Sequence, residues 1–144
     1  MIDAGAQVNI QNRQGETSLM IAIRHRNHVI TKKLIEQKNI IVNAQNNDGR
    51  NALMEAVDNN DLTTTYMLLR KPEIDIELVN KHNQSVLMLA IKNNFEEIAS
   101  LLLKAGSSQR GIDNFNLSCL DYAKKNKNEF LIKSLTQGDD KNLE

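Results

Sequence analysis

Three histidines come first, because an imidazole ring can bind a metal or carry a proton during catalysis. His25 and His28 stand three residues apart in a segment that we expect to connect two helices, and His82 lies in a separate turn. A spacing of three is compatible with metal binding. No Cys, Asp or Glu near this pair completes a set of ligands, so we interpret the histidines as polar surface residues. We therefore expect neither a metal nor another cofactor.

The single cysteine, Cys119, is the thiol that could act as a nucleophile. It falls in the first turn of an expected helix, where the amide dipoles can lower a thiol pKa. A nucleophile also needs a base within reach, and the neighbouring sequence offers none. We favour a role for Cys119 as a small buried side chain. One cysteine also excludes an internal disulfide and favours a reducing compartment.

Phosphate-binding motifs are not recognisable. Residues 106–111 include two glycines, but they join two helical segments rather than a strand and a helix. The basic run 124–127 lies near the end of an expected helix, where positive charge is favourable. The alternative for that run is a contact with phosphate or nucleic acid. The carboxylates are scattered, with no pair in a shared cleft. We predict that the chain is not an enzyme and takes no small-molecule substrate.

Composition narrows the class of protein further. The 144 residues include 18 basic and 18 acidic side chains, so no net charge draws the chain to nucleic acid or to an anionic membrane. The longest apolar run, 86–91, is too short to cross a bilayer, and residues 1–5 lack the features of a signal peptide. Only 3% of residues are aromatic, which favours thin layers of packed helices. We expect a monomer in the cytoplasm.

A period of 34 residues organises the sequence. Four segments align in one register, and their shared alanine recurs at spacings of 34, 34 and 33 residues, at Ala22, Ala56, Ala90 and Ala123. A leucine stands three residues before each alanine, on the same face of an expected helix. A second helical pattern follows a short polar break, over residues 29–35, 63–69, 98–103 and 131–135. Each repeat is thus a turn followed by two helices.

The turns explain the remaining shared positions. An Asn or Asp opens each turn, because its side chain can bond the backbone two residues further on: Asn12, Asn46, Asn80 and Asp113. Three residues later comes a residue type that tolerates positive φ: Gly15, Gly49, Asn83 and Asn116. A helix N-cap follows at Thr17, Asn51, Ser85 and Ser118. The turn and the start of the first helix are therefore encoded locally.

These boundaries divide the chain into a repeat domain over 1–136 and a loose tail over 137–144. The repeats cover 12–45, 46–79, 80–112 and 113–136, and residues 1–11 match the end of a preceding repeat. Because a repeat cannot bury its apolar face alone, we expect the chain to be an excised piece of a longer protein.

The repeats resemble the ankyrin family, whose first helix opens with T-P-L-H-x-A. The resemblance rests on the asparagine-to-glycine turn, the Leu-x-x-Ala pattern, the Ile/Leu-rich second helix and segments such as 5–9. It implies an all-α solenoid of helix-turn-helix units joined by β-hairpin-like turns. The motif's Pro and His are absent; the His position holds Met20, Met54, Met88 and Asp121. We expect Met to fill that space and the fold to persist with modest stability.

The resemblance also implies where a partner binds. Family members usually hold protein partners on a concave side, which is formed by the turn tips and the exposed positions of the first helices. The corresponding residues here are Arg13, Gln14, Glu16, Arg24, His25, Asn47, Asp48, Arg50, Asp58, Asn59, Lys81, His82, Gln84, Lys92, Asn93, Asn114, Phe115, Leu117, Lys125 and Asn126. Six of them are basic and three are acidic. Phe115 and Leu117 are either a binding hot spot or a cover over the last repeat.

We predict that the chain is a protein–protein interaction module that serves as a scaffold or a targeting element. One alternative is a substrate-docking part of a larger enzyme, such as a secreted effector that acts in a host cytoplasm. Another alternative is a nucleic-acid-binding module, whose binding would depend steeply on salt and on Arg24, Lys92 and Lys125.

Overall fold

A computed structural model describes the backbone of residues 7–141 and the side chains of residues 7–137. Within this range it contains eight helices and no strand. The first helices of the repeats are α1 (Ser18–Arg24), α3 (Ala52–Asp58), α5 (Val86–Lys92) and α7 (Cys119–Lys125). The second helices are α2 (His28–Ile35), α4 (Leu62–Leu69), α6 (Glu96–Lys104) and α8 (Glu129–Lys141). The all-α class expected from the sequence is confirmed.

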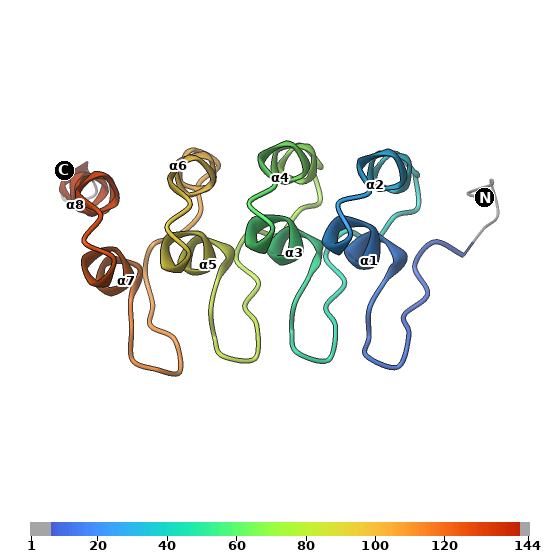
Figure 1. The fold of residues 1–144 in the computed structure, drawn as a ribbon, viewed down its shortest axis with the longest axis horizontal. Helices are drawn as coiled ribbons and strands as arrows, with labels where there is room; N and C mark the ends of the chain where they lie inside the picture. Colours follow the sequence, from blue (N-terminus) through green and yellow to red (C-terminus); the bar gives the residue numbers. More distant parts are fainter. Residues whose placement is uncertain (1–6, 142–144) are drawn as a thin grey trace. The chain divides into compact units, whose positions relative to one another are not determined.

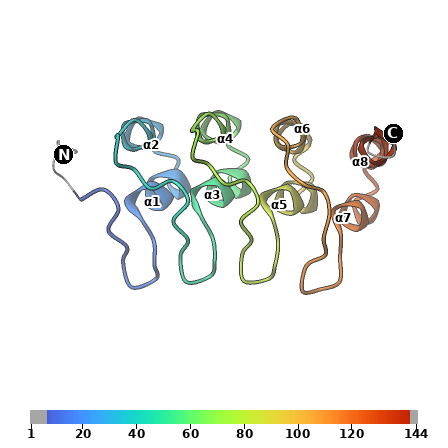
Figure 2. The same cartoon turned by 180° about the vertical axis from the view of Figure 1, so that it is seen from behind.

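The chain divides into two units of two repeats each. The N-terminal unit comprises residues 1–75 and contains α1 to α4, and the C-terminal unit comprises residues 76–144 and contains α5 to α8. Within each unit the first helices pack side by side, and each also packs against the second helix of its own repeat. Hairpins project from one side of the first helices, while the second helices cover the other side (Figures 1 and 2).

The hairpins form as their turn residues predict. In the first repeat, the Asn12 side-chain Oδ1 accepts hydrogen bonds from the Gln14 and Glu16 amides at 3.0 and 2.9 Å. The Gly15 amide closes the turn on the Asn12 carbonyl oxygen at 2.9 Å. Where asparagine replaces this glycine, at Asn83 and Asn116, φ is 59° and 64°. Asparagine therefore supports the left-handed turn conformation in the last two repeats.

Every first helix begins at its expected cap. Side-chain oxygens of Thr17, Asn51 and Ser85 accept hydrogen bonds from the backbone amide three residues later. In the fourth repeat, Ser118 and Asp121 form a reciprocal capping box. Asp121 occupies a position that methionine fills in the other repeats, so this repeat exchanges buried apolar volume for a stronger cap. The Ser-x-x-Asp spacing in the sequence is typical of such a box.

The core of each unit lies between the first and second helices. Its largest side chains are fully buried, including Leu19 and Met54 in the N-terminal unit and Leu87 and Leu131 in the C-terminal unit. Methionines at the position of the family's histidine are at most 3% exposed, at Met20, Met54 and Met88. The expectation that methionine fills this space is confirmed.

The two ends of the chain differ from what the sequence predicts or lie outside the described residues. The tail expected to be loose begins as helix, because α8 continues to Lys141; residues 142–144 lie outside the described residues. Residues 1–6, expected to end a preceding repeat, also lie outside them. The threonine-rich α4 is also helical: Asp61 caps it by accepting from the Thr64 amide, and the buried hydroxyls of Thr64 and Thr65 donate to Asp61 at 2.7 and 2.8 Å. In the described part of the chain, no helix has the length and apolarity to span a membrane.

Candidate binding face of the hairpin tips and first helices

The hairpin tips of each unit are joined by backbone hydrogen bonds. In the N-terminal unit, the Asn47 amide donates to the Gln14 carbonyl oxygen at 2.9 Å, and the Asn47 side chain donates to the Arg13 carbonyl oxygen at 2.8 Å. In the C-terminal unit, Asn114 makes the same pair of bonds, to the His82 and Lys81 carbonyl oxygens at 2.9 and 3.1 Å. The tips thus present neighbouring side chains at fixed spacing.

Gly15 lets the two tips of the N-terminal unit approach. A Cβ atom added there would lie 3.0 Å from both the Asn46 Cα and the Asn47 amide nitrogen, which are backbone atoms that cannot rotate away. The φ of 78° at Gly15 would itself strain another residue. Glycine is therefore required at this tip for both conformation and contact.

We call the hairpin tips together with the exposed positions of the first helices the tip face of each unit. Most residues that the sequence placed there are exposed or half-buried. Gln84 is the correction, because it is only 2% exposed and its side chain bonds inward. Asn59 and Asn126 also have structural contacts: each donates to the last carbonyl oxygens of the preceding first helix, at Ile23 and Ile91, at 2.7 and 2.8 Å.

The N-terminal tip face carries a network of ion pairs. Arg24 contacts Glu16 and reaches Glu55 at 3.4 Å, while Arg50 lies 3.2 Å from Glu55 and also contacts Asp58. Glu55 is 6% exposed and is shared by both arginines. The sequence did not predict a role for Glu55. It lies in the middle of a first helix, whereas the predicted face comprised hairpin tips and exposed positions of the first helices.

Electrostatics hold this network in its charged form. The hydrogen bond from Arg24 lowers the pKa of Glu16. Burial works against the charge of Arg50, but the carboxylates of Asp58 and Glu55 outweigh burial and raise its pKa. The network lines a depression of about 850 Å³ together with the adjoining hairpin tips. Its arginines are already paired, so this face has little unbalanced positive charge to offer a partner.

The C-terminal unit has a network in which neutral side chains donate to one buried carboxylate. The Asp113 Oδ2 accepts hydrogen bonds from the Tyr122 hydroxyl and, at 3.1 Å, from the Gln84 amide. Its Oδ1 accepts from the Phe115 and Leu117 amides at 2.9 and 3.0 Å. Burial disfavours the carboxylate, but these bonds outweigh burial and lower the pKa of Asp113 to about 2. The fourth hairpin is thereby anchored to the third repeat.

Phe115 and Leu117 flank the tip of the fourth hairpin. The Phe115 ring is 58% exposed and lies against the His82 ring, with 5.5 Å between centroids. Leu117 is half-buried. A ring that exposes more than half of its surface is a poor cover for the repeat, which favours the hot-spot interpretation of Phe115.

Catalytic chemistry is not supported at the candidates that the sequence raised. Cys119 is buried, and burial raises the pKa of its thiol to about 12. His28 lies 2.9 Å from the buried carboxylate of Asp61, which also caps α4, so it links two repeats. Across the part of the chain that the structure describes, no three His, Cys, Asp or Glu side chains form a group that could hold a metal ion.

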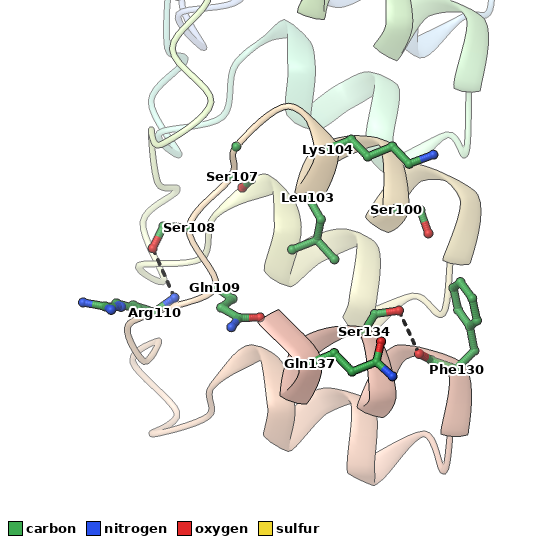
Figure 3. A pocket seen from close by; sticks show the side chains of 11 residues that line it. Ser100, Leu103, Lys104, Ser107, Ser108, Gln109, Arg110, Phe130, Ser134 and Gln137 are labelled. Carbon is green, nitrogen blue, oxygen red and sulfur yellow. Dashed lines mark hydrogen bonds between the residues drawn. The ribbon is translucent and has the colours of Figure 1, made fainter. Parts of the chain in front are cut away.

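A second hollow lies away from the tip face, between α6 and α8 in the C-terminal unit. This groove of about 730 Å³ is lined largely by small and amide side chains, with Leu103 pointing into it and Arg110 directed away (Figure 3). Ser134 bonds back to the Phe130 carbonyl oxygen at 2.9 Å. The groove holds no pairing of nucleophile and base, and no cluster of charge.

The structure repeats a pair of helices preceded by a hairpin that an Asn or Asp opens, at intervals of 33–34 residues. A comparison with protein families identifies this repeat. A family model described as ankyrin repeats (3 copies) matches residues 1–80 and 67–144. The chain belongs to the ankyrin-repeat family. No curated protein matches the chain closely enough to count as a relative. Ankyrin repeats are generally protein–protein interaction modules and are typically not catalytic.

Proposed function

We propose that this ankyrin-repeat chain binds a partner protein on its tip face, the concave side in the family's usual mode, and acts as a scaffold or targeting element. The observation that supports it is the lateral bonding of neighbouring tips, through Asn47 in one unit and Asn114 in the other. Side chains held at fixed spacing lose little entropy when a partner binds. We further propose a cytoplasmic setting, in keeping with the single reduced cysteine.

The N-terminal arginines would be poor positions for testing this proposal. Reversing Arg24 or Arg50 would place a carboxylate beside Glu16, Glu55 or Asp58 and would destabilise the fold. A loss of binding would then be indistinguishable from a loss of structure. The test needs exposed tip residues whose side chains can be changed without disturbing these ion pairs.

Site-specific photo-crosslinking meets that need. A benzoylphenylalanine is placed singly at the tip residues Arg13 and Phe115, and at Lys33 and Lys133 on the second helices as matched exposed controls. The intact chain is irradiated in extract of its source cells, and the products are identified by mass spectrometry. We expect one protein to crosslink from the tips and not from the second helices. Crosslinks confined to Lys33 and Lys133 would contradict the tip face as the binding site.

A further inference from the structure

The two tip faces carry the same five positions with different chemistry. Each position is counted as the number of residues after the Asn or Asp that opens the turn. The five are position four in both repeats of a unit, position nine in its second repeat, and position twelve in both repeats. In the N-terminal unit all five are charged and joined in ion pairs: Glu16, Arg24, Arg50, Glu55 and Asp58. In the C-terminal unit they are Gln84, Lys92, Leu117, Tyr122 and Lys125.

The two lysines of this C-terminal set are not neutralised by the fold. Lys92 and Lys125 are exposed, and within the described residues no carboxylate lies within 4.0 Å of their amines. Asp113 and Asp121 keep their negative charge but form no ion pair with these lysines: Asp113 is buried and accepts from Tyr122, and Asp121 caps α7 with Ser118. The positive charge of this face therefore remains available to a ligand.

The helix ends that carry the two lysines are joined by a hydrogen bond, and Leu117 occupies a repeat position adjacent to that of Lys125. The Asn126 side chain, next to Lys125, donates to the Lys92 carbonyl oxygen at 3.2 Å. In the N-terminal unit the side chains at positions four and twelve of the second repeat, Arg50 and Asp58, touch. Leu117 and Lys125 occupy these positions in the fourth repeat, and from this equivalence we infer that they are neighbours on the C-terminal tip face.

Phe115 stands two residues before Leu117 at the hairpin tip, where its ring is exposed and rests on His82. The C-terminal tip face therefore combines unneutralised positive charge with one exposed aromatic ring and one half-buried leucine. An exposed ring on the same face as unpaired charges suits an anchor that is surrounded by polar contacts. No equivalent apolar side chain occurs at the N-terminal tips, where Arg13 and Gln14 precede Gly15.

We propose that the C-terminal tip face, at Lys92, Lys125, Phe115 and Leu117, binds an acidic peptide segment of a partner protein that carries a large apolar side chain. The proposal rests on the proposed function and specifies the partner's chemistry. Carboxylates would pair with the two lysines, while the apolar side chain would pack on Phe115 and Leu117. Nucleic acid is less favoured, because one exposed ring and two lysines do not form a basic groove with stacking platforms.

Selection from a random library of displayed 12-residue peptides tests this inference with the intact chain. Enriched peptides are synthesised with a fluorescent label, and their dissociation constants are measured by fluorescence anisotropy. We expect enrichment of Asp and Glu together with Phe, Leu or Trp. Peptides without acidic enrichment would overturn the proposal, and so would the enrichment of no peptide at all.

Matched variants locate the binding site. Lys92→Glu with Lys125→Glu, and separately Phe115→Ala, should each weaken binding by at least about tenfold. The controls change the same residue types on second helices: Lys104→Glu with Lys133→Glu, and Phe130→Ala, whose ring is 52% exposed. These should alter affinity by less than about twofold. Circular dichroism confirms that every variant is folded.

The outcomes separate this inference from the proposed function. Peptides that lose affinity on Arg13→Glu or Asn47→Ala, but not on the C-terminal substitutions, would overturn the inference and leave tip-face binding intact. Peptides indifferent to every tip-face substitution would overturn both. A labelled 20-nucleotide single strand that binds more tightly than the selected peptides, and that loses affinity with Lys92 and Lys125, would replace the proposal with nucleic-acid recognition.

Discussion

The ninth position after the turn-opening residue is Glu55 in the second repeat and Tyr122 in the fourth, and the two side chains organise their units differently. Glu55 joins Arg24 and Arg50 in a network of full charges. Tyr122 instead donates to Asp113, with Gln84 as a neutral third member. One fold position can thus couple neighbouring repeats through ion pairs or through neutral donors. The ion pairs neutralise the arginines Arg24 and Arg50 on the N-terminal tip face. The C-terminal network leaves Lys92 and Lys125 without a carboxylate partner among the residues that the structure describes.

Of the changes that test this difference between the units, removal of the Asp113 carboxylate should lower the unfolding free energy most. Asp113→Ala leaves the Tyr122 hydroxyl, the Gln84 amide and two backbone amides without their acceptor, which should cost about 3 kcal/mol of unfolding free energy. Asn46→Ala is the matched change in the N-terminal unit, where the Asn46 Oδ1 accepts from two backbone amides, and should cost about 1 kcal/mol. Urea denaturation followed by circular dichroism measures both. Equal losses would refute a special role for the Asp113 network.

Acid should act on the same carboxylate. The pKa of Asp113 is lowered from its ordinary 3.8 to about 2, so the carboxylate contributes stability above the unfolded pKa and loses it as pH falls through the folded one. At 1.36 kcal/mol per pKa unit, this contribution is about 2 kcal/mol and disappears between about pH 4 and pH 2.

Asp113→Asn supplies the control for acid sensitivity, because it keeps the Oδ1 acceptor without a charge that titrates. Urea denaturation of the parent and of this variant is compared between pH 2 and pH 6. We expect their difference in unfolding free energy to shrink as pH falls below 4, since the parent alone loses the contribution of the carboxylate. A difference independent of pH would show that Asp113 does not titrate in this range.

Neutralising Glu55 should have a smaller effect on the N-terminal unit. Glu55→Gln leaves Arg50, whose side chain is only 21% exposed, without one of its two carboxylate partners, and should cost about 1.5 kcal/mol. Asp58→Asn, where the carboxylate is 33% exposed, should cost about 0.5 kcal/mol. Amide hydrogen exchange resolved by mass spectrometry assigns each loss to a unit. A loss from Glu55→Gln that appeared in residues 76–144 would contradict a network local to residues 1–75.

The sequence predicts the local features of these repeats better than their networks. The Asx turns, the positive φ at Asn83 and the N-caps depend on residues within five positions of each other, so their patterns can be read directly. The burial of Gln84 and the central place of Glu55 depend on side chains about 30 residues away in the neighbouring repeat. A single sequence gives the repeat period but not which way these side chains turn. The basic excess predicted for the face lies in the C-terminal unit, because the predicted N-terminal residues already balance at three basic and three acidic. Counting Glu55 gives the N-terminal set one acid more than its arginines.

The smallest predicted effect is that of salt on the two networks. It is measured as the coupling energy between two side chains at low and high salt. A double-mutant cycle on the Glu16–Arg24 pair, with Gln at both positions, should yield about 0.5 kcal/mol at low salt and nearly none in about 1 M NaCl, where the Debye length is about 3 Å. A cycle of Gln84→Leu with Tyr122→Phe, which removes the hydrogen bond of 3.2 Å, should yield about 1 kcal/mol at both salt concentrations. Buried neutral donors are not screened by ions, whereas an Arg24 side chain that is 42% exposed is. Equal salt sensitivity of the two cycles would remove the electrostatic distinction between the two networks.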